Sequence, residues 1–211
     1  MLIGGFLKKS LIEYPGKISV IVFTRGCNFR CPFCHNPELL DLSVPSQEEG
    51  EIFSYLEKYR SWLEAVVISG GEPTLQEDLA GFCSRVKDAG FLVKLETNGS
   101  RPDVLTTLIN RKLLDLVQMD IKGTVDERRY QDLAVAGWAA MAVQESINLL
   151  KSSGVKHEFV TTFIPGIHSD AEIERIRREF GIPSESYRLQ KFRPDLVLDM
   201  KALGDLGFKK T

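Results

Sequence analysis

The chain has 211 residues, and a chain of this length buries about 70% of the surface that its unfolded form exposes, so it needs no disulfide bonds to build a core. Hydrophobic residues make up 43% of the sequence and charged residues 27%, which is ordinary globular composition and excludes disorder as the default state. The 27 lysine and arginine residues nearly balance the 29 aspartate and glutamate residues, so we expect no nucleic-acid partner.

Six apolar segments rich in β-branched residues have the composition of strands, and each ends close to a Gly, Pro or Asn. Because these segments are nearly continuous apolar runs, we expect both faces of each strand to be covered. In chain order the predicted strands are Ile18–Thr24, Ala65–Ser69, Phe91–Glu96, Leu114–Ile121, Phe159–Ile164 and Tyr187–Phe192.

Helical patterns alternate with these strands. The first, Gln47–Arg60, places Ile52 and Leu56 on one face, and the second, Leu79–Ala89, stops at Gly90. The remaining predicted helices are Asp103–Arg111, Ala139–Ser153 and Asp170–Phe180.

Strands that alternate with helices predict an α/β fold whose parallel strands are joined by right-handed crossovers, here in a single domain that spans residues 1–211. A closed eight-unit barrel typically needs about 250 residues, whereas this chain has room for six units. We therefore expect a partial, open (β/α)6 barrel of the TIM type. In such folds the chemistry collects at the carboxyl ends of the strands, which is where the unusual residues of this sequence lie.

The start of the chain and the length of its apolar runs indicate the cellular compartment. Residues 1–10 lack the order of a secretory signal, in which a basic region precedes an apolar core and a cleavage site. No apolar run reaches the about 18 residues needed to cross a bilayer. We therefore expect a cytoplasmic protein with no membrane partner, in a reducing compartment where clustered cysteines indicate metal or redox chemistry.

Three of the four cysteines, Cys27, Cys31 and Cys34, lie close together directly after the first predicted strand. Thiolates suit soft metals and iron–sulfur clusters, and a tight loop can direct all three sulfurs at one point. Three ligands on a four-iron, four-sulfur cluster leave one iron without a protein ligand, and an exogenous chelator can bind that iron. The pattern therefore predicts a 4Fe–4S cluster.

A structural zinc site on the three cysteines and His35 is the alternative. Structural zinc usually pairs two ligands with two more from a distant segment, and this sequence has no distant cysteine pair. The adjacent side chains of Cys34 and His35 can hardly both turn to one small tetrahedral ion. The cluster is therefore favoured over zinc.

The spacing Cys-x3-Cys-x2-Cys, with Phe33 before the last cysteine, resembles the signature of the radical S-adenosylmethionine (SAM) superfamily. The resemblance implies that the open iron binds the amino and carboxylate groups of SAM and that the reduced cluster donates one electron into the sulfonium. Cleavage of a carbon–sulfur bond then gives methionine and a 5′-deoxyadenosyl radical, which abstracts a hydrogen atom.

Further motifs at predicted strand ends resemble elements of the same superfamily and imply contacts with SAM. Gly70–Pro73 resembles the Gly-Gly-Glu-Pro motif, whose backbone and carboxylate hold the amino group of the methionine part. Relatives often carry Arg where this chain has Val160, so contacts there differ. The residues implied in cofactor binding are Phe33, Asn36, Gly70, Gly71, Glu72, Pro73, Thr97, Asn98, Asp120, Lys122 and Thr162. Cys83 fits a buried helix position, and His157 and His168 receive no role.

The segments Ser10–Ser19 and Gly26–Leu39 resemble most closely the activating proteins of anaerobic ribonucleoside-triphosphate reductase, which more often carry Asp in place of Glu13. The resemblance implies a protein substrate, since those relatives abstract hydrogen from a backbone glycine of the reductase. A reduced flavodoxin or ferredoxin would supply the electron. We assign no catalytic acid or base, because the cofactor carries the chemistry.

Three other interpretations stay open. The chain could activate another glycyl-radical enzyme, such as pyruvate formate-lyase, whose activators share the Cys34-His35-Asn36 sequence. It could act on a small molecule, as 7-carboxy-7-deazaguanine synthase does with a similarly reduced barrel. A non-catalytic, zinc-binding interaction module is the alternative from a different class.

Overall fold

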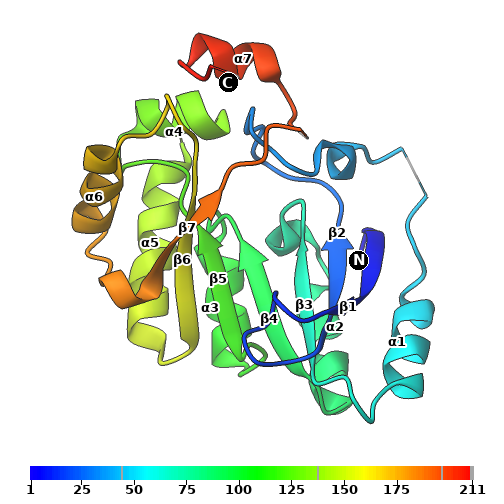
Figure 1. The fold of residues 1–211 in the computed structure, drawn as a ribbon. Coiled ribbons are helices and arrows are strands. Elements are labelled where there is room, and N and C mark those ends of the chain that lie inside the picture. Colours follow the sequence, from blue (N-terminus) through cyan, green and yellow to red (C-terminus); the bar gives the residue numbers. More distant parts are fainter. Residues whose placement is uncertain (44, 137, 196, 210–211) are drawn as a thin grey trace.

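A seven-stranded sheet forms the centre of the molecule in the computed structural model, which describes residues 1–43, 45–136, 138–195 and 197–209 (Figure 1). The strands follow one another in the sheet in the same order as in the chain. The first pair is antiparallel and the following five pairs are parallel. The strands are β1 (Ile3–Ser10), β2 (Ser19–Thr24), β3 (Ala65–Gly70), β4 (Leu92–Thr97), β5 (Leu116–Asp120), β6 (Lys156–Phe163) and β7 (Tyr187–Lys191).

Strands β2 to β7 confirm the six predicted parallel strands and the open barrel. The sheet does not close, because β1 and β7 lie at its two edges. Strand β1 was not predicted: its sequence IGGFLKKS carries two glycines and two lysines, which weaken a strand pattern. Such a sequence suits an edge strand, where charged side chains reach solvent.

Helices cover one face of this sheet, with α2, α3 and α5 behind it in the view of Figure 1. The predicted helices are confirmed with ends shifted by a few residues. Two helices were missed: α4, which follows a polar loop, and the short α7 near the C-terminus. The helices are α1 (Glu49–Lys58), α2 (Leu79–Asp88), α3 (Pro102–Asn110), α4 (Glu127–Ala134), α5 (Ala139–Ser153), α6 (Asp170–Glu179) and α7 (Met200–Asp205), with 3-10 turns at Pro37–Leu40, Pro73–Leu75 and Ser184–Ser186.

The main hydrophobic core lies between the sheet and these helices. Alternate residues of the central strands, such as Val66, Val93 and Val117, are fully buried there. Side chains on the other face of the strands differ between the two halves of the sheet. On β2 and β3 they are apolar, and Ile21 and Val67 form a small second core with Tyr14. Most of the apolar surface is therefore buried on the helix side of the sheet, and the opposite face of β4 to β7 carries polar groups.

Lys94 lies among the polar groups on that opposite face, and only 1% of it is exposed. Its ammonium contacts Gln118 at 2.8 Å, Glu96 at 2.9 Å and the backbone carbonyl of Glu13 at 2.6 Å. A buried charge is tolerated when it is paired and hydrogen-bonded in this way. The contact with Glu13 also holds the segment after β1 against the open face of the sheet.

No single helix in the described part of the chain is long and apolar enough to cross a bilayer. Helices α4 and α5 reach the required length and hydropathy only when they are taken together, and they are bent by 99° at the break between them.

Candidate functional site

A cavity opens at the carboxyl ends of the parallel strands, where the predicted site residues lie. It brings together segments that are far apart in the sequence, from the loop after β2 to the end of β7. The residues that line it are Cys27, Phe29, Cys31, Phe33, Cys34, His35, Asn36, Leu40, Ser69, Gly70, Gly71, Glu72, Glu96, Thr97, Asn98, Gln118, Asp120, Lys122, Thr162 and Gln190. Every residue predicted from sequence to hold the cluster or SAM is among them except Pro73. Pro73 is buried and begins a 3-10 turn, so it shapes the loop from outside the cavity.

The loop that carries the three cysteines leaves β2 through Gly26, whose positive φ of 80° suits glycine and turns the chain sharply. Within the loop, the Cys34 backbone N–H donates to the Cys31 carbonyl at 3.0 Å. The N–H of Arg30 donates to the carbonyl of Ala134 at 2.9 Å, which fastens the loop to the end of α4. The loop is therefore anchored by a helix that the sequence did not predict.

All three cysteines of the loop are free thiols, with Cys31 buried and the other two partly buried. Burial raises the pKa of Cys27 to about 11 and the pKa of Cys31 to about 12, against an ordinary value of 9.0. Both thiols are therefore protonated at neutral pH, and metal binding must release their protons.

The fourth cysteine offers a clean test of how burial affects these thiols. Cys83 lies on the buried face of α2, and burial raises its pKa to about 12 from 9.0. A group whose pKa is higher in the folded state than in the unfolded state contributes its full stabilisation when the pH lies below the unfolded-state pKa. This stabilisation is lost as the pH rises from the unfolded-state pKa to the folded-state pKa.

We therefore expect Cys83→Ala to lose less stability than the parent as the pH rises above 9.0. The free energy of unfolding of the parent should fall by about 1.4 kcal/mol per pH unit more than that of the variant. Urea denaturation of both metal-free proteins at about pH 8 and about pH 10.5 measures the difference. Parallel decline of the two proteins would contradict a raised pKa at Cys83.

The donor set fits an iron–sulfur cluster. The three thiols line one cavity and lie near enough for their charges to affect one another's pKa. However, no three His, Cys, Asp or Glu side chains of the described residues converge closely enough to hold one metal ion. Thiolates are the ligands of iron–sulfur clusters, so three thiols on one cavity fit the predicted cluster on Cys27, Cys31 and Cys34.

The Gly70-Gly71 turn after β3 packs directly against the cysteine loop. The N–H of Gly71 donates to the Thr24 carbonyl, and the N–H of Glu72 donates to the Gly26 carbonyl, both at 2.8 Å. A side chain at Gly71 would overlap with the Gly26 carbonyl oxygen. Glycine is required here because the two loops touch through their backbones.

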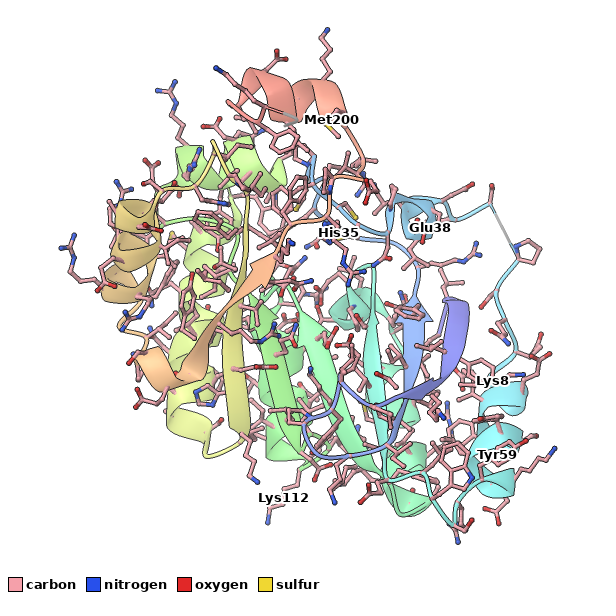
Figure 2. All side chains as sticks on the ribbon, viewed as in Figure 1. Lys8, His35, Glu38, Tyr59, Lys112 and Met200 are labelled. Carbon is pink, nitrogen blue, oxygen red and sulfur yellow. The ribbon has the colours of Figure 1, made fainter. Side chains whose placement is uncertain are left out.

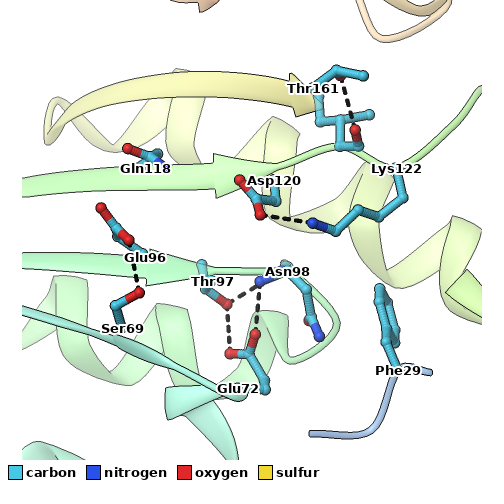
Figure 3. A network of polar contacts seen from close by, with 12 residues as sticks. Phe29, Ser69, Glu72, Glu96, Thr97, Asn98, Gln118, Asp120, Lys122 and Thr161 are labelled. Carbon is cyan, nitrogen blue, oxygen red and sulfur yellow. Dashed lines mark hydrogen bonds and ion pairs between the residues drawn. The ribbon is translucent and has the colours of Figure 1, made fainter. Parts of the chain in front are cut away.

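The carboxylate of Glu72 faces the end of β4, as Figure 3 shows, and is almost fully buried. One oxygen accepts from the hydroxyl of Thr97 at 2.7 Å and from the N–H and hydroxyl of Thr74. The other accepts from the N–H of Asn98 at 2.7 Å. Burial raises the pKa of Glu72, while the hydrogen bonds from Asn98, Thr74 and Thr97 oppose that rise. The Glu72 carboxylate therefore ties the turn after β3 to the end of β4.

Asn98 connects this network to the cysteine loop. Its side-chain amide donates to the Oδ1 of Asn28 at 3.0 Å and lies 3.9 Å from the sulfur of Cys27. Asn28 in turn donates to Ser100 at 2.8 Å. The contribution of Asn28 was missed from sequence, although its place between two cysteines could have indicated it. The predicted Thr97-Asn98 turn thus lies beside the thiols.

Asp120 and Lys122 lie at the end of β5 and pair with each other, at 2.7 Å between the ammonium and Oδ2 (Figure 3). The Lys122 ammonium also lies 5.8 Å from the centre of the Phe33 ring. Burial disfavours the charged form of Lys122, but Asp120 and the thiols of Cys31 and Cys34 outweigh it and raise the pKa of the ammonium. A permanent cation therefore stands next to the thiols.

The two threonines of β6, Thr161 and Thr162, point to opposite faces of the sheet. Thr162 lines the cavity, whereas Thr161 points away and accepts a hydrogen bond from the hydroxyl of Tyr187. Val160 is buried and pairs in register with Asp120. An apolar side chain therefore stands beside the carboxylate of Asp120, at the position where relatives often carry a cation.

His35 joins the cysteine loop to the segment after β7 and lies below α7 in the view of Figure 2. Its ring stacks on Phe192 with 5.8 Å between ring centres, and its Nε2 accepts from the backbone N–H of Arg193 at 3.2 Å. The N–H of Asp199 donates to the carbonyl of Pro32 at 3.0 Å. The segment after β7 therefore packs against the cysteine loop, a contact that sequence reasoning missed.

Most of this chain matches a known protein family. A family model described as the radical SAM superfamily matches residues 21–180. The chain belongs to the radical SAM superfamily. The matched range contains the cysteine loop and strands β3 to β6, so it includes most of the cavity described above.

Three known proteins illustrate the range of relatives. A Methanocaldococcus jannaschii protein named as a candidate glycyl-radical enzyme activating enzyme is 35% identical over 203 residues, which is 94% of this chain and 82% of the relative. The pyruvate formate-lyase-activating enzyme of Listeria monocytogenes is 34% identical over 53% of this chain and 49% of its own length. The crystal structure of Streptococcus suis SuiB bound to S-adenosylmethionine has the same fold, with a TM-score of 0.64 at 14% identity. The match covers 88% of this chain but only 46% of SuiB, which is therefore much longer.

Proposed function

We propose that this chain holds a 4Fe–4S cluster on Cys27, Cys31 and Cys34 and uses it to cleave SAM reductively. The observation that carries the proposal is the meeting of three free thiols in one cavity with the Gly70-Gly71 turn, inside a superfamily fold. When bound, the cluster would supply one electron to SAM, which splits into methionine and a 5′-deoxyadenosyl radical that removes a hydrogen atom from the substrate.

In this proposal the residues of the chain bind and orient the cluster and SAM. The Lys122 ammonium compensates the negative charge of the thiolates and offers a cation to the SAM carboxylate. Glu72 holds the Thr97-Asn98 turn in position beside Cys27. Gly70 and Gly71 carry no side chain, which allows the methionine part of SAM to approach their backbone closely. Phe33, Asn36, Asp120 and Thr162 would complete the contacts from the other sides of the cavity.

We propose that the substrate is a glycine in a glycyl-radical enzyme, and that this enzyme is anaerobic ribonucleoside-triphosphate reductase. The relative from Methanocaldococcus jannaschii, matched over nearly the whole chain, supports a glycyl-radical partner. The resemblance of Ser10–Ser19 and Gly26–Leu39 to reductase activators favours the reductase. The pyruvate formate-lyase-activating relative matches only about half of this chain, so it is the second candidate.

A reduced flavodoxin or ferredoxin is the proposed electron donor, because the reaction consumes one electron that the chain itself does not store. A cytoplasmic location belongs to the same proposal, since a reducing compartment keeps the four cysteines free.

The test is anaerobic reconstitution with iron and sulfide, followed by reduction, SAM and a candidate partner. We expect 5′-deoxyadenosine and a glycine-centred doublet in the electron paramagnetic resonance (EPR) spectrum of the reductase, with no such doublet on pyruvate formate-lyase. A doublet on the lyase alone would assign the other partner. Zinc binding without SAM cleavage would indicate the non-catalytic module and refute the proposed activity.

A further inference from the structure

Exposed apolar side chains gather where α4 ends and α5 begins. The exposed fraction is 47% for Val135, 59% for Trp138 and 76% for Met141. Trp138 and Met141 are three residues apart at the start of α5, so their side chains are neighbours on one face of the helix. Neighbouring apolar side chains that face solvent mark surfaces that bind a partner. We call these three residues the apolar patch.

The backbone at Val135 is strained. Val135 ends α4 with a φ of 53° and a ψ of 38°, in the left-handed region that a β-branched residue rarely adopts. Strain of this kind collects at functional segments, because the rest of the fold must hold it in place. The turn that displays the apolar patch is therefore held against its local preference.

A ring contact joins the apolar patch to the cysteine loop. The ring of Trp138 meets the ring of Phe29 edge to face, with 6.2 Å between ring centres. Phe29 lines the cavity, and its N–H donates to the sulfur of Cys27 at 3.4 Å. The hydrogen bond from Arg30 to Ala134 holds α4 beside the same loop, as Figure 1 shows. The Phe29 ring therefore lies between the exposed surface and the thiols.

Charges of both signs border the apolar patch. Arg30 is exposed, and its guanidinium donates to the carbonyl of Phe29 at 2.9 Å, which holds it at the surface of the cysteine loop. Asp132 and Glu145 lie one helical turn from the apolar residues. An apolar centre with a charged rim is the usual anatomy of a protein interface, and small interfaces are typical of transient electron-transfer complexes.

The kind of partner follows from what can pass the Phe29 ring. Trp138 does not line the cavity, so a substrate atom bound at the apolar patch cannot reach the thiols. An electron can, because electrons tunnel over short distances through packed atoms. The proposed reaction consumes one electron from outside the chain, and SAM and the substrate glycine would occupy the cavity side of the cysteine loop. The side with the apolar patch is left for the electron donor.

We propose that reduced flavodoxin docks on the apolar patch and passes its electron through Trp138 and Phe29 to the cluster. The inference rests on the proposed function, which supplies the need for a donor. The flavin is a flat apolar ring system whose edge reaches the surface of its protein, so it can pack against Trp138. In this step the flavin hydroquinone is oxidised by one electron, the oxidised cluster is reduced by that electron, and no bond or proton moves.

Binding is tested on the metal-free protein through the emission of Trp138. The chain has two tryptophans, and Trp62→Phe leaves Trp138 as the reporter. Oxidised flavin absorbs where tryptophan emits, so we expect oxidised flavodoxin to quench this emission and to saturate. In the same background, Met141→Glu should bind flavodoxin at least about tenfold more weakly, because docking would bury an unpaired charge.

Ile12→Glu is the matched control, and we expect it to bind flavodoxin like the parent. Ile12 is 82% exposed and lies between β1 and β2, at the opposite end of β2 from the cysteine loop. Met141 is the third residue of α5, where a glutamate suits the helix start, so Met141→Glu should fold normally.

Reduction is tested on the reconstituted protein by stopped-flow bleaching of the cluster colour and by EPR. Met141→Glu should be reduced by flavodoxin at least about tenfold more slowly than the parent. Dithionite is small enough to enter the cavity without docking, so it should reduce the parent, Met141→Glu and Ile12→Glu at the same rate.

Four results would overturn the inference. Equal binding and equal reduction by flavodoxin in Met141→Glu and the parent would refute it, while SAM cleavage driven by dithionite would leave the proposed function standing. Slower reduction of Met141→Glu by dithionite as well would show damage to the cluster site instead of lost docking. Loss of only the glycine-centred doublet, with dithionite as reductant, would assign the apolar patch to the substrate protein. Slowed reduction by a ferredoxin but not by flavodoxin would assign it to the other donor. A parent that formed no cluster would refute the proposed function itself.

Discussion

Replacement of Cys31 by Ala is expected to abolish the cluster and to lower the formation of 5′-deoxyadenosine at least about 100-fold. Loss of a residue that only orients a metal ligand typically costs about 10- to 100-fold, and loss of the ligand itself should cost more. Cys31 is the most deeply buried of the three thiols in the cavity, so no water-exposed group can take its place easily. Iron and sulfide content after anaerobic reconstitution, together with product formation from SAM, measures the effect.

The control for this experiment is Cys83→Ala. Cys83 is as buried as any core residue but lies on the core-facing side of α2 and does not line the cavity. We expect this variant to bind a full cluster and to lose only about 1 kcal/mol of folding stability. A Cys31→Ala protein that kept its iron and its activity would show that the cluster ligands have been misassigned.

Glu72→Gln is expected to destabilise the protein by about 2 kcal/mol and to weaken SAM binding at least tenfold. The Glu72 carboxylate accepts four hydrogen bonds, from the N–H and hydroxyl of Thr74, the hydroxyl of Thr97 and the N–H of Asn98. The amide nitrogen of Gln is itself a donor, so one buried N–H or hydroxyl would lose its acceptor. The Thr97-Asn98 turn, which lies against Cys27, would then shift.

Urea denaturation of the metal-free protein and calorimetric titration of the reconstituted protein with SAM measure the two effects separately. Glu64→Gln is the matched control, because Glu64 pairs with Lys17 at the exposed surface and its loss should change stability by less than about 0.5 kcal/mol. If Glu72→Gln matched the parent in both measurements, the Glu72 carboxylate would have no role in holding the strand ends together.

The parallel part of the fold was predictable because local signals agreed with the final packing. Strands such as Ala65–Gly70 are covered on both faces and read as apolar runs, and helices such as α2 end at a glycine. Strand β1 was not predictable in this way, since pairing with β2 rather than its own composition makes it a strand. Helix α4 was missed because only three of its eight residues, Tyr130, Leu133 and Ala134, are apolar or buried, and its anchoring to Arg30 is a tertiary contact.

The site was predictable wherever a motif follows a strand. The cysteines, Glu72, Asn98 and Lys122 lie on one cavity because the carboxyl ends of parallel strands meet at one edge of the sheet. The partners of these residues were not predictable, since they depend on side-chain directions across the sheet. The donors to the Glu72 carboxylate and the stacking of His35 on Phe192 are of this kind.

The backbone junction between the turn after β3 and the cysteine loop constrains how this protein can change. Gly71 and Gly26 touch without any intervening side chain, and two further backbone hydrogen bonds join the same loops. No single substitution can widen or narrow that spacing gradually, because the smallest added atom already collides. The spacing between the cysteine loop and the turn after β3 is therefore set by the backbones of both loops, and a change in one loop requires a matching change in the other.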